Sequence, residues 1–386
     1  MSSARSTVTT PGAVGRARAA RRASLAGQLG VSDKLFSSPA ERRFVRAVEA
    51  GLDRVEAGLV DQVHFTDSLA DVTSRYLLEA GGKRVRPMLT LLAAQLGSGA
   101  TDAVVTSAMA IEITHLASLY HDDVMDEAQL RRGVPAAHSV WGNSVAVLTG
   151  DLLFARASKL IASLGERAIQ LQADTFERLC LGQLHETLGP QQGDDPIEHY
   201  IQVLSDKTGS LIAAAAEFGV VFSGAPEEFE QPMVEFGEKI GIAFQLVDDV
   251  IDLSDDRERT GKSAGTDLRA GVATLPLLRL RRAAESDASA RDLLDRLEQH
   301  VIGVPEEAAG AEAAGVEPAG AESPGADAEA ARAAIAELRE HPLTAETRAE
   351  ADEWARQAVA AISVLPDGPV KKSMTRFATA IVERSG

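Results

Sequence analysis

Two acidic motifs are the part of this sequence best suited to chemistry. Each reads DDxxD, and together they supply Asp122, Asp123, Asp126, Asp248, Asp249 and Asp252. In a helix, the first and last aspartates of one motif lie about 40° apart, one turn along the same face. Carboxylates at this spacing repel one another, and placing them among apolar residues costs more than exposing them. A cation should compensate, and Mg²⁺ suits the pattern because it binds a few carboxylates together with waters and phosphates.

A solvated acidic helix face is the alternative for either motif taken alone. Apolar residues flank both motifs, however, with Ile111 and Leu116 before the first and Ile240 and Leu246 before the second. Two copies in such surroundings favour a metal site over two solvated faces. A calcium-binding EF-hand fits less well, because neither motif has the Gly-centred loop spacing.

Basic residues gather around the acidic motifs and could bind an anionic substrate. The string GGKRVRP, from Gly81 to Pro87, is a glycine turn with three cations and a predicted helix start at Pro87. Further candidates are Arg131, Arg132, Lys207 with Thr208, and Lys262. His115 precedes Asp122 by seven residues, two turns back on nearly the same face. Singly these are ordinary surface cations and a structural histidine, but their placement near the aspartates favours diphosphate binding.

Helical periodicity covers most of the chain and should position these residues. From about Pro39, apolar residues recur at three- and four-residue steps, and no stretch has a convincing strand period. Scarce aromatics, at 4%, and abundant Ala, Leu, Glu and Arg also favour helices. We therefore expect an all-α protein with one helical domain, built from residues 39–302 and 328–386.

Two segments fall outside this helical pattern. Residues 1–38 form a small, polar and basic tail, which predicts disorder. Residues 303–327 are rich in Ala, Gly, Glu and Pro, which predicts a disordered insertion at the surface. The tail has no apolar core typical of a secretory signal; a transit peptide and a weak contact with anionic membrane are the alternatives to a plain extension.

Composition narrows the partners and the compartment. The formal net charge is −18, which argues against nucleic acid as a partner. The single cysteine, Cys180, cannot form an intrachain disulfide framework and fits a reducing compartment, so we expect a cytoplasmic protein. No uninterrupted apolar run reaches the roughly 18 residues of a membrane span.

Several strings together resemble the trans-isoprenyl diphosphate synthases, or polyprenyl synthetases. They are GGKRVRP, HLASLYHDDVMDEAQLRRG, KTGSL, FQLVDDVIDLSDD and GKSAGTDL, and they occur in the family's order from about Leu35 to the C-terminus. The resemblance implies an all-α bundle with a deep central cavity, usually a homodimer. It also implies Mg²⁺ as cofactor, three ions per active site, with Mn²⁺ as a substitute.

The resemblance assigns a role to each motif residue. Asp122, Asp126 and Asp248 are implied as direct metal ligands, and Asp123, Asp249 and Asp252 as further or outer ligands. Arg131, Lys207 and Lys262 are implied to hold an allylic diphosphate, and Lys83, Arg86, His115 and Arg132 to hold isopentenyl diphosphate. Thr208 and Gln245 are implied to line the same site.

The implied reaction needs no protein nucleophile. Metal ions and basic residues neutralise the leaving diphosphate, so the allylic C–O bond ionises. The double bond of isopentenyl diphosphate attacks the cation, and loss of a proton restores an alkene. The residues expected to carry catalysis are Asp122, Asp126, Asp248, Lys207 and Arg131.

Two small residues before the first motif predict a long product. Ser118 and Ala117 lie four and five residues before Asp122, where short-chain members of the family carry a bulky aromatic. Tyr120 lies on roughly the opposite face and should not form the cavity floor. Because neither small side chain blocks a growing tail, we expect a product of about C30 to C50. A quinone side chain is the expected use, with farnesyl or geranylgeranyl diphosphate as starter.

Four other functions remain open at this point. A short-chain farnesyl or geranylgeranyl diphosphate synthase would share the motifs. A terpene cyclase would carry a mixed Asn/Ser/Glu second motif and no isopentenyl site, unlike this sequence. A non-catalytic subunit of a heteromeric synthase would not need intact metal motifs, and a structural helical protein would have no reason to bury so many aspartates.

Overall fold

The computed structural model of the chain describes residues 38–254, 264–304 and 324–383. Its elements, in chain order, are α2 (Pro39–Gln62), α3 (Ser68–Glu79), α4 (Val85–Ala93), η2 (Ala94–Leu96), α5 (Asp102–Met125), β1 (Leu130–Arg131), β2 (Val134–Pro135), α6 (Ala137–Trp141), α7 (Asn143–Ala162), α8 (Glu166–Leu188), α9 (Pro196–Leu204), η3 (Ser205–Gly209), α10 (Ser210–Ser223), η4 (Glu227–Phe229), α11 (Glu230–Asp252), α13 (Thr266–Arg269), α14 (Leu275–Ala283), α15 (Ala288–His300), α17 (Pro324–Glu340), α18 (Pro342–Ala361), η6 (Ile362–Val364) and α19 (Pro369–Val382). The expected all-α fold is confirmed.

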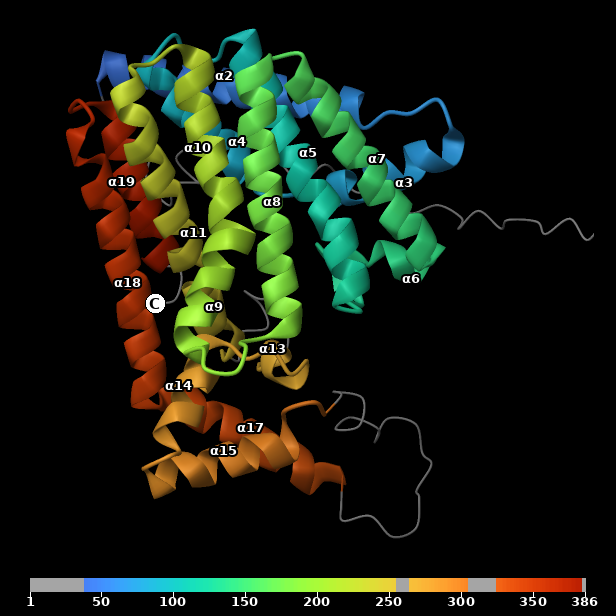
Figure 1. Cartoon of the computed structure of the whole chain (residues 1–386), viewed down its shortest axis with the longest axis vertical. Coiled ribbons are helices and arrows are strands. Elements are labelled where there is room, and N and C mark those ends of the chain that lie inside the picture. The colour runs from blue at the N-terminus through green and yellow to red at the C-terminus, as the bar shows by residue number, and fades with distance from the viewer. Residues whose placement is uncertain (1–37, 255–263, 305–323, 384–386) are drawn as a thin grey trace, which may run out of the picture.

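Long helices stand side by side in the middle of the molecule. Figure 1 shows α5, α7, α8, α10 and α11 upright, with α18 and α19 along one flank and α14, α15 and α17 at the lower end. A large apolar core joins the N-terminal helices to α10, α11, α18 and α19, and a smaller one joins α13, α14, α15 and α17. The two aspartate motifs lie on α5 and α11 of the central group.

Helix α5 is a long helix that lies mostly inside the protein. It begins after Thr101, whose side chain accepts a hydrogen bond from the N–H of Val104, and it runs for 24 residues. It is long and apolar enough to span a membrane by composition alone, but 78% of its apolar window is buried inside the protein. Its apolar character therefore reflects a core helix that carries a motif at its end.

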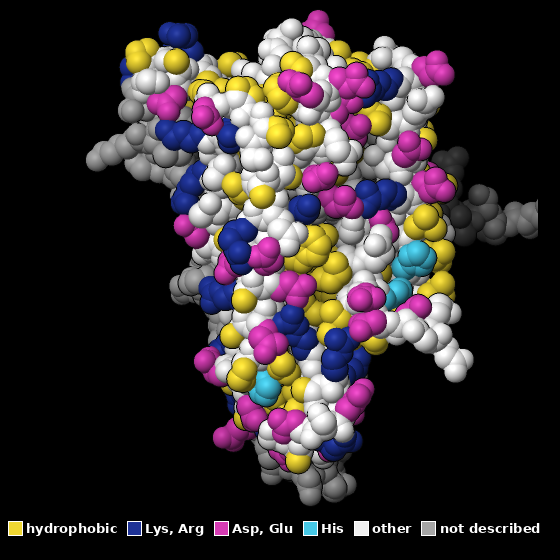
Figure 2. Space-filling view, turned by 60° about the vertical axis from the view of Figure 1, so that its left-hand side comes forward, with side chains coloured by type: hydrophobic (Ala, Val, Ile, Leu, Met, Phe, Trp, Pro, Cys, Tyr) yellow, Lys and Arg dark blue, Asp and Glu magenta, His cyan; other side chains and the backbone are white. Residues whose placement is uncertain are grey.

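One face of the bundle mixes charges of both signs. Figure 2 shows acidic and basic side chains along the length of this face, with hydrophobic side chains grouped in its middle. Basic side chains are interspersed with acidic ones on this face and do not form a broad patch.

The structure corrects four details of the expected elements. Helix α4 begins at Val85, two residues before the predicted Pro87, because a proline in the first helical turn forfeits no hydrogen bond. A two-residue hairpin, β1–β2, is too short to leave a strand period in the sequence. Ser38, assigned to the tail, caps α2. Helix α17 begins at Pro324, so residues 324–327 of the predicted disordered insertion are helical.

Parts of the predicted appendages lie outside the described residues. These are residues 1–37 of the tail and residues 305–323 of the insertion. Lys262, a predicted diphosphate-binding residue, also lies outside the described residues. The division into one domain with two appendages therefore stays a prediction.

Candidate active site

The first aspartate motif lies at the carboxyl end of α5. Asp122 is half-buried, and the exposed Asp126 ends the helix, its N–H donating to the Asp122 carbonyl oxygen at 2.8 Å. Burial raises the pKa of Asp122 to about 6; Lys207 and Arg131 act against this shift, and Asp126 adds to it. The Asp122 carboxylate therefore lies within electrostatic reach of cations from two other segments.

Asp123 has a different environment from its neighbour. Its side chain is fully buried, and Oδ1 accepts a hydrogen bond from Arg131 Nε at 2.6 Å. Within the described ranges, Oδ2 has no hydrogen-bond partner. Burial raises the pKa of Asp123 even though Arg131 favours the charged form. Asp123 thus holds Arg131 beside the motif.

The β1–β2 hairpin carries both arginines that follow the first motif. Arg132 occupies its turn with a φ of 53°, in the left-handed region. Arg132 Nη1 donates to the carbonyl oxygens of Leu77, at 2.7 Å, and Gly81. The hairpin is therefore fastened to the glycine turn between α3 and α4, and it brings Arg131 and Arg132 to the same side of the bundle.

The glycine turn contains a buried arginine to which the sequence analysis gave no role. Arg84 is 4% exposed, and it pairs with Glu56 Oε2 at 2.8 Å and with Glu112 Oε1 at 3.2 Å. Its hydrogen bonds tie the turn to α2 and α5. Lys83, one residue earlier, is exposed.

His115 lies beside two cations, Arg86 and Arg132. Arg86 Nε is buried and has no hydrogen-bond partner in the part of the chain that the structure describes. Burial lowers the pKa of Arg86 to about 10, with Glu112 opposing and Arg132 reinforcing the shift. Burial, Arg86 and Arg132 also hold the pKa of His115 well below its usual range. An anionic ligand would relieve this repulsion.

The second aspartate motif is partly used to join helices. Asp249 is buried; its carboxylate accepts hydrogen bonds from Tyr200 Oη, at 3.0 and 2.9 Å, and from the N–H of Leu275 at 3.2 Å. Burial raises the pKa of Asp249 to about 7 although both hydrogen bonds act against the shift. Asp252 Oδ2 accepts from the N–H of Asp267 at 3.0 Å. Asp249 and Asp252 thus fasten α11 to α9, α13 and α14.

Asp248 and Gln245 occupy half-buried positions on the same stretch of α11. The Asp248 carboxylate is close enough to Asp249 to raise the pKa of that residue. Asp248 therefore lies beside the buried Asp249 in the second motif.

A third segment, the π-helical turn η3, completes the site. It carries Lys207 and Thr208, both half-buried, and Lys207 Nζ forms an ion pair with the Glu186 carboxylate on α8. Lys207 and Glu186 both affect the pKa of Asp122. Sequence reasoning missed Glu186, because a single acid on an amphipathic helix has no distinctive spacing.

The two predicted chain-length residues are buried on α5. Ala117 is 0% and Ser118 8% exposed, and the Ser118 hydroxyl donates to the His115 carbonyl oxygen at 2.9 Å. Thr114, four residues before Ser118 on α5, accepts a hydrogen bond from Gln172 Nε2 of α8 at 3.0 Å. Tyr120 is also fully buried, and its hydroxyl bonds to the Thr73 carbonyl oxygen of α3.

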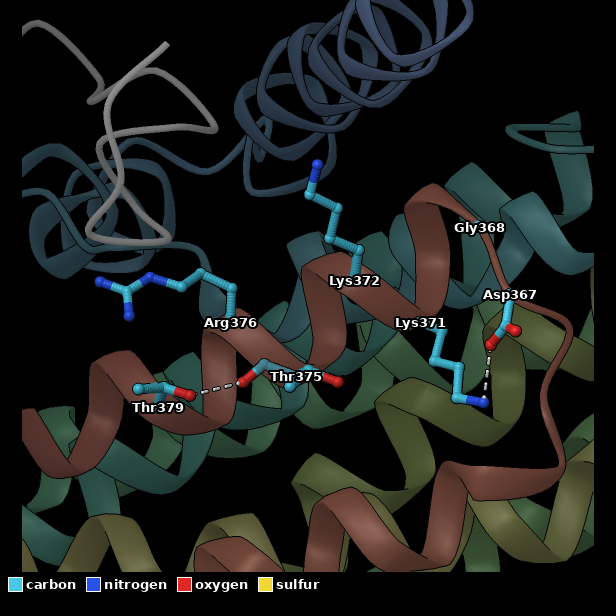
Figure 3. A pocket seen from close by; sticks show the side chains of 7 residues that line it. All are labelled: Asp367, Gly368, Lys371, Lys372, Thr375, Arg376 and Thr379. Atoms are coloured by element: carbon cyan, nitrogen blue, oxygen red, sulfur yellow. Dashed lines mark hydrogen bonds and ion pairs between the residues drawn. The ribbon is translucent and has the colours of Figure 1, made fainter. Parts of the chain in front are cut away.

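A separate pocket of about 390 Å³ lies along α19. It is lined by Asp367, Gly368, Lys371, Lys372, Thr375, Arg376 and Thr379, all shown in Figure 3. Acidic neighbours pair with its cations: Asp367 with Lys371 at 3.1 Å, Glu41 with Lys372 at 2.7 Å, and Glu383 with Arg376 at 2.8 Å. No residue that the sequence analysis selected lines this pocket.

A family model described as polyprenyl synthetase matches residues 68–307 of the chain. The chain belongs to the polyprenyl synthetase family. Its relatives include the nonaprenyl diphosphate synthase of Mycobacterium tuberculosis (strain ATCC 25618 / H37Rv), which is 40% identical over 344 residues, 89% of this chain and 95% of that protein. The match establishes a trans-prenyltransferase.

Two solved structures of polyprenyl synthetases share the fold. A polyprenyl synthase from Caulobacter crescentus CB15, complexed with calcium and isoprenyl diphosphate, superposes with a TM-score of 0.73 at 31% identity, covering 89% of this chain and 98% of that chain. A geranylgeranyl pyrophosphate synthase from Corynebacterium glutamicum, also complexed with calcium and isoprenyl diphosphate, gives 0.72 at 36% identity, covering 91% and 99%.

Among the residues that the structure describes, the carboxylates of this polyprenyl synthetase do not form a closed metal cage. In residues 38–254, 264–304 and 324–383, no group of three acidic or histidine side chains could hold a metal ion by itself. Mg²⁺ does not require such a cage, because it is commonly bound by one or two carboxylates with waters and substrate phosphates. Burial raises the pKa of Asp122, and a bound cation would offset this effect because it favours the charged carboxylate.

Proposed function

We propose that this polyprenyl synthetase is a Mg²⁺-dependent enzyme that adds isopentenyl diphosphate to an allylic diphosphate and makes a long all-trans prenyl diphosphate. The observation that carries the proposal is the convergence on Asp122 of α5. Lys207 from η3, Arg131 from the hairpin and Glu186 from α8 all lie within its electrostatic reach. Calcium and isoprenyl diphosphate in the Caulobacter crescentus structure support a divalent cation and a prenyl diphosphate here.

The metal ligands in this proposal come from three helices. Asp122, Asp126 and Asp248 bind Mg²⁺, and we add Glu186 as a nearby carboxylate. Asp123, Asp249 and Asp252 act from outer positions through the contacts described above. Three ions per site, with Mn²⁺ as a substitute, stay part of the proposal. When bound, the ions neutralise charge on the leaving diphosphate.

The basic residues orient the two substrates in this scheme. Lys207 and Arg131 bind the allylic diphosphate, so charge that develops as the C–O bond breaks is stabilised. Arg86, His115 and Arg132 hold isopentenyl diphosphate with its double bond near the allylic carbon. That π pair forms the new C–C bond, and the departing diphosphate accepts the proton. In the proposal, Lys262 joins Lys207 and Arg131 in binding the allylic diphosphate, Lys83 joins the residues that bind isopentenyl diphosphate, and Thr208 and Gln245 line the same site.

A long product is favoured by the small residues before the motif. Ala117 and Ser118 cannot block a prenyl tail as an aromatic ring would, and the similarity to a nonaprenyl diphosphate synthase points the same way. We propose a product of about C30 to C50, started from farnesyl or geranylgeranyl diphosphate and used for a quinone side chain. A shorter product is the alternative, because a geranylgeranyl pyrophosphate synthase is similar at 36% identity.

A homodimer in the cytoplasm is also part of the proposal. Exposed apolar side chains occur along the neighbouring helices α7 and α8: Val147, Leu148, Leu152, Ile169, Phe176, Leu181, Leu184 and Leu188. Leu148 is 60% and Leu188 63% exposed, which is costly for a monomer with so many apolar neighbours. A second copy of the chain would cover this face.

The direct test is a condensation assay with the purified chain. Radiolabelled isopentenyl diphosphate, farnesyl diphosphate and Mg²⁺ are incubated with it, and the dephosphorylated products are separated by chromatography. The proposal predicts a product ladder, that is, a series of labelled prenyl chains of increasing length that ends in a long chain. No labelled product should form when EDTA removes the metal. Products no longer than geranylgeranyl would establish the short-chain alternative. Unlabelled cyclised products of farnesyl diphosphate would indicate a cyclase, and the absence of both labelled and cyclised products would indicate a non-catalytic subunit.

A further inference from the structure

The helical run from α9 to α10 is interrupted by one π-helical turn at the active site. The turn η3 covers Ser205–Gly209, and the Ser210 N–H donates to the Ser205 carbonyl oxygen five residues back. Single π turns insert a residue into a helix and are frequent at functional sites. Here the turn carries Lys207, which pairs with Glu186 beside Asp122. The position of the Lys207 ammonium therefore depends on what holds this turn.

A polar network from two neighbouring helices holds the side of η3 next to Lys207. Arg178 of α8 donates from Nε to Asp206 Oδ1 at 2.8 Å and from Nη2 to Glu238 Oε1, on α11, at 2.6 Å. The Ser205 hydroxyl donates to the same Glu238 oxygen at 2.5 Å. Gln202 Nε2 donates to the remaining Asp206 oxygen at 2.7 Å. Arg178 is thus the cation that two carboxylates share.

Glycines allow the same two helices to contact the backbone of η3. A Cβ atom on Gly182 of α8 would lie 2.5 Å from the Lys207 nitrogen, and one on Gly241 of α11 would lie 2.5 Å from Gly209 Cα. Real Cβ atoms essentially never come so close, so both positions require glycine as long as η3 stays where it is. The turn is therefore clamped between α8 and α11.

The contacts that α8 makes with η3 come from one stripe of the helix. Arg178, Gly182 and Glu186 follow one another at four-residue steps, which places them along one helix face. In this order they contact the Asp206 side chain, the Lys207 backbone and the Lys207 ammonium. Although burial acts against its charge, the hydrogen bonds that Arg178 donates to Glu238 and Asp206 raise its pKa, so Arg178 is charged at neutral pH.

We propose that Arg178 is a positioning residue: through Asp206 and Glu238 it sets the π turn so that Lys207 meets the diphosphate of the allylic substrate. The inference rests on the proposed function, because the allylic diphosphate is the ligand assigned to Lys207. Arg178 has no assigned contact with either substrate. Its loss leaves two carboxylates facing each other at the base of the turn and releases the turn from α8.

The test compares kinetic constants of Arg178→Met with those of wild type. We expect kcat to fall and KM for the allylic diphosphate to rise, each about tenfold, because small misplacements of a binding group cost rate steeply. KM for isopentenyl diphosphate should stay within about twofold, because its cations lie on other segments. Arg178→Lys, which keeps the charge, should recover part of the loss. Inorganic pyrophosphate binding by calorimetry should weaken in parallel.

Two further variants separate positioning from general damage. Arg167→Met removes another ion pair from α8 to α11, with Glu230, far along the helix from η3, and should leave both KM values unchanged. In a Lys207→Met background, Arg178→Met should add little, because the group that it positions is gone. Gly182→Ala, which pushes on the Lys207 backbone, should reproduce the Arg178→Met pattern.

The outcomes are distinct. Unchanged constants in Arg178→Met, an equal rise of both KM values, or full additivity with Lys207→Met would overturn the inference. A lower Tm with a reduced kcat but unchanged KM values would reduce Arg178 to a structural role. If the wild-type chain itself condenses nothing, the proposed function fails first, and pyrophosphate binding alone still tests the positioning of Lys207.

Discussion

Ser118 and Ala117 carry a prediction that one side chain can test. Both are buried next to the predicted path of the growing chain. Ser118→Phe should shorten the longest product by several isoprene units, because the ring fills space that the tail would use. The product ladder measures this directly. Ser139→Phe, at an exposed position of α6, is the matched control and should leave the ladder unchanged; an identical ladder in both variants would place the floor elsewhere.

Gln172 is the residue that we expect to set the floor of that path. Its amide crosses from α8 to Thr114, just beyond Ala117 and Ser118, and its Oε1 is buried without a hydrogen-bond partner among the described residues. Gln172→Ala should lengthen the product, because the crossing side chain is removed. Thr175→Ala, three residues along α8, is the control, since its hydroxyl bonds only its own helix at Leu171. A shorter or unchanged product would contradict the assignment.

At the scale of elements, the aspartates of the second motif should separate into two classes. Asp249→Asn weakens the bonds to Tyr200 and Leu275 that join α11 to α9 and α14, and should cost about 1–3 kcal/mol of stability. Asp248→Asn should cost less stability than Asp249→Asn, because Asp248 is only half-buried, and should abolish Mg²⁺-dependent activity. Thermal unfolding and condensation rates, measured on both variants, test the distinction. Equal losses of stability would show that the motif acts as one unit.

The start of α2 supplies a pH-dependent prediction. The capping box with Ser38 and the ion pair with Lys372 lower the pKa of Glu41 to about 2, with Lys372 as the largest cause. Since the folded pKa is depressed, the stabilisation is complete above the unfolded value of about 4.5 and is lost as the pH falls through about 2. Glu41→Ala should therefore lower the Tm at pH 7 more than at pH 3.

Thermal unfolding at both pH values, in low and high salt, measures the effect. Lys372→Met should reproduce much of the pH dependence, because it removes the same pair. High salt should reduce the Tm difference between wild type and Glu41→Ala, since the Glu41–Lys372 ion pair is at the surface. A Tm difference that does not change with pH would assign the effect to the helix cap alone.

Sequence reasoning found the residues of this site better than it found their contacts. The DDxxD spacing placed Asp122 and Asp126 one turn apart, because helix periodicity is local. The spacing could not show that Asp249 accepts a hydrogen bond from Tyr200 or that Asp123 forms an ion pair with Arg131, because those partners depend on how the helices pack. Glu186 and Arg178 were missed for the same reason: each contributes one charge to a network assembled from several elements.

At the scale of the whole molecule, the exposed face of α7 and α8 predicts association. Leu184→Glu on this face should shift the protein from dimer to monomer, because a charge would be buried against apolar residues of the second copy. Light scattering across a concentration series measures the mass. Val364→Glu is the control, because Val364 is 62% exposed on η6, outside that face. A wild-type chain that is monomeric at all concentrations would reject the dimer.

The bundle as a whole was predictable from sequence, and its exceptions have local causes. Helical periodicity from Pro39 onward indicated one all-α architecture, because each helix had to bury an apolar stripe. The sequence did not predict the π turn at η3. The extra residue of a π turn lies within a continuous helical pattern and requires no particular residue type. The β1–β2 hairpin was hidden for a similar reason, being only two residues per strand.

The apolar character of α5 has a consequence during synthesis. When residues 102–125 have just left the ribosome, α7, α8 and α10, which help to enclose α5, have not yet emerged. For that interval the nascent chain exposes a segment with the hydropathy of a membrane span. Holdase chaperones that bind such segments should therefore engage this stretch of the nascent chain.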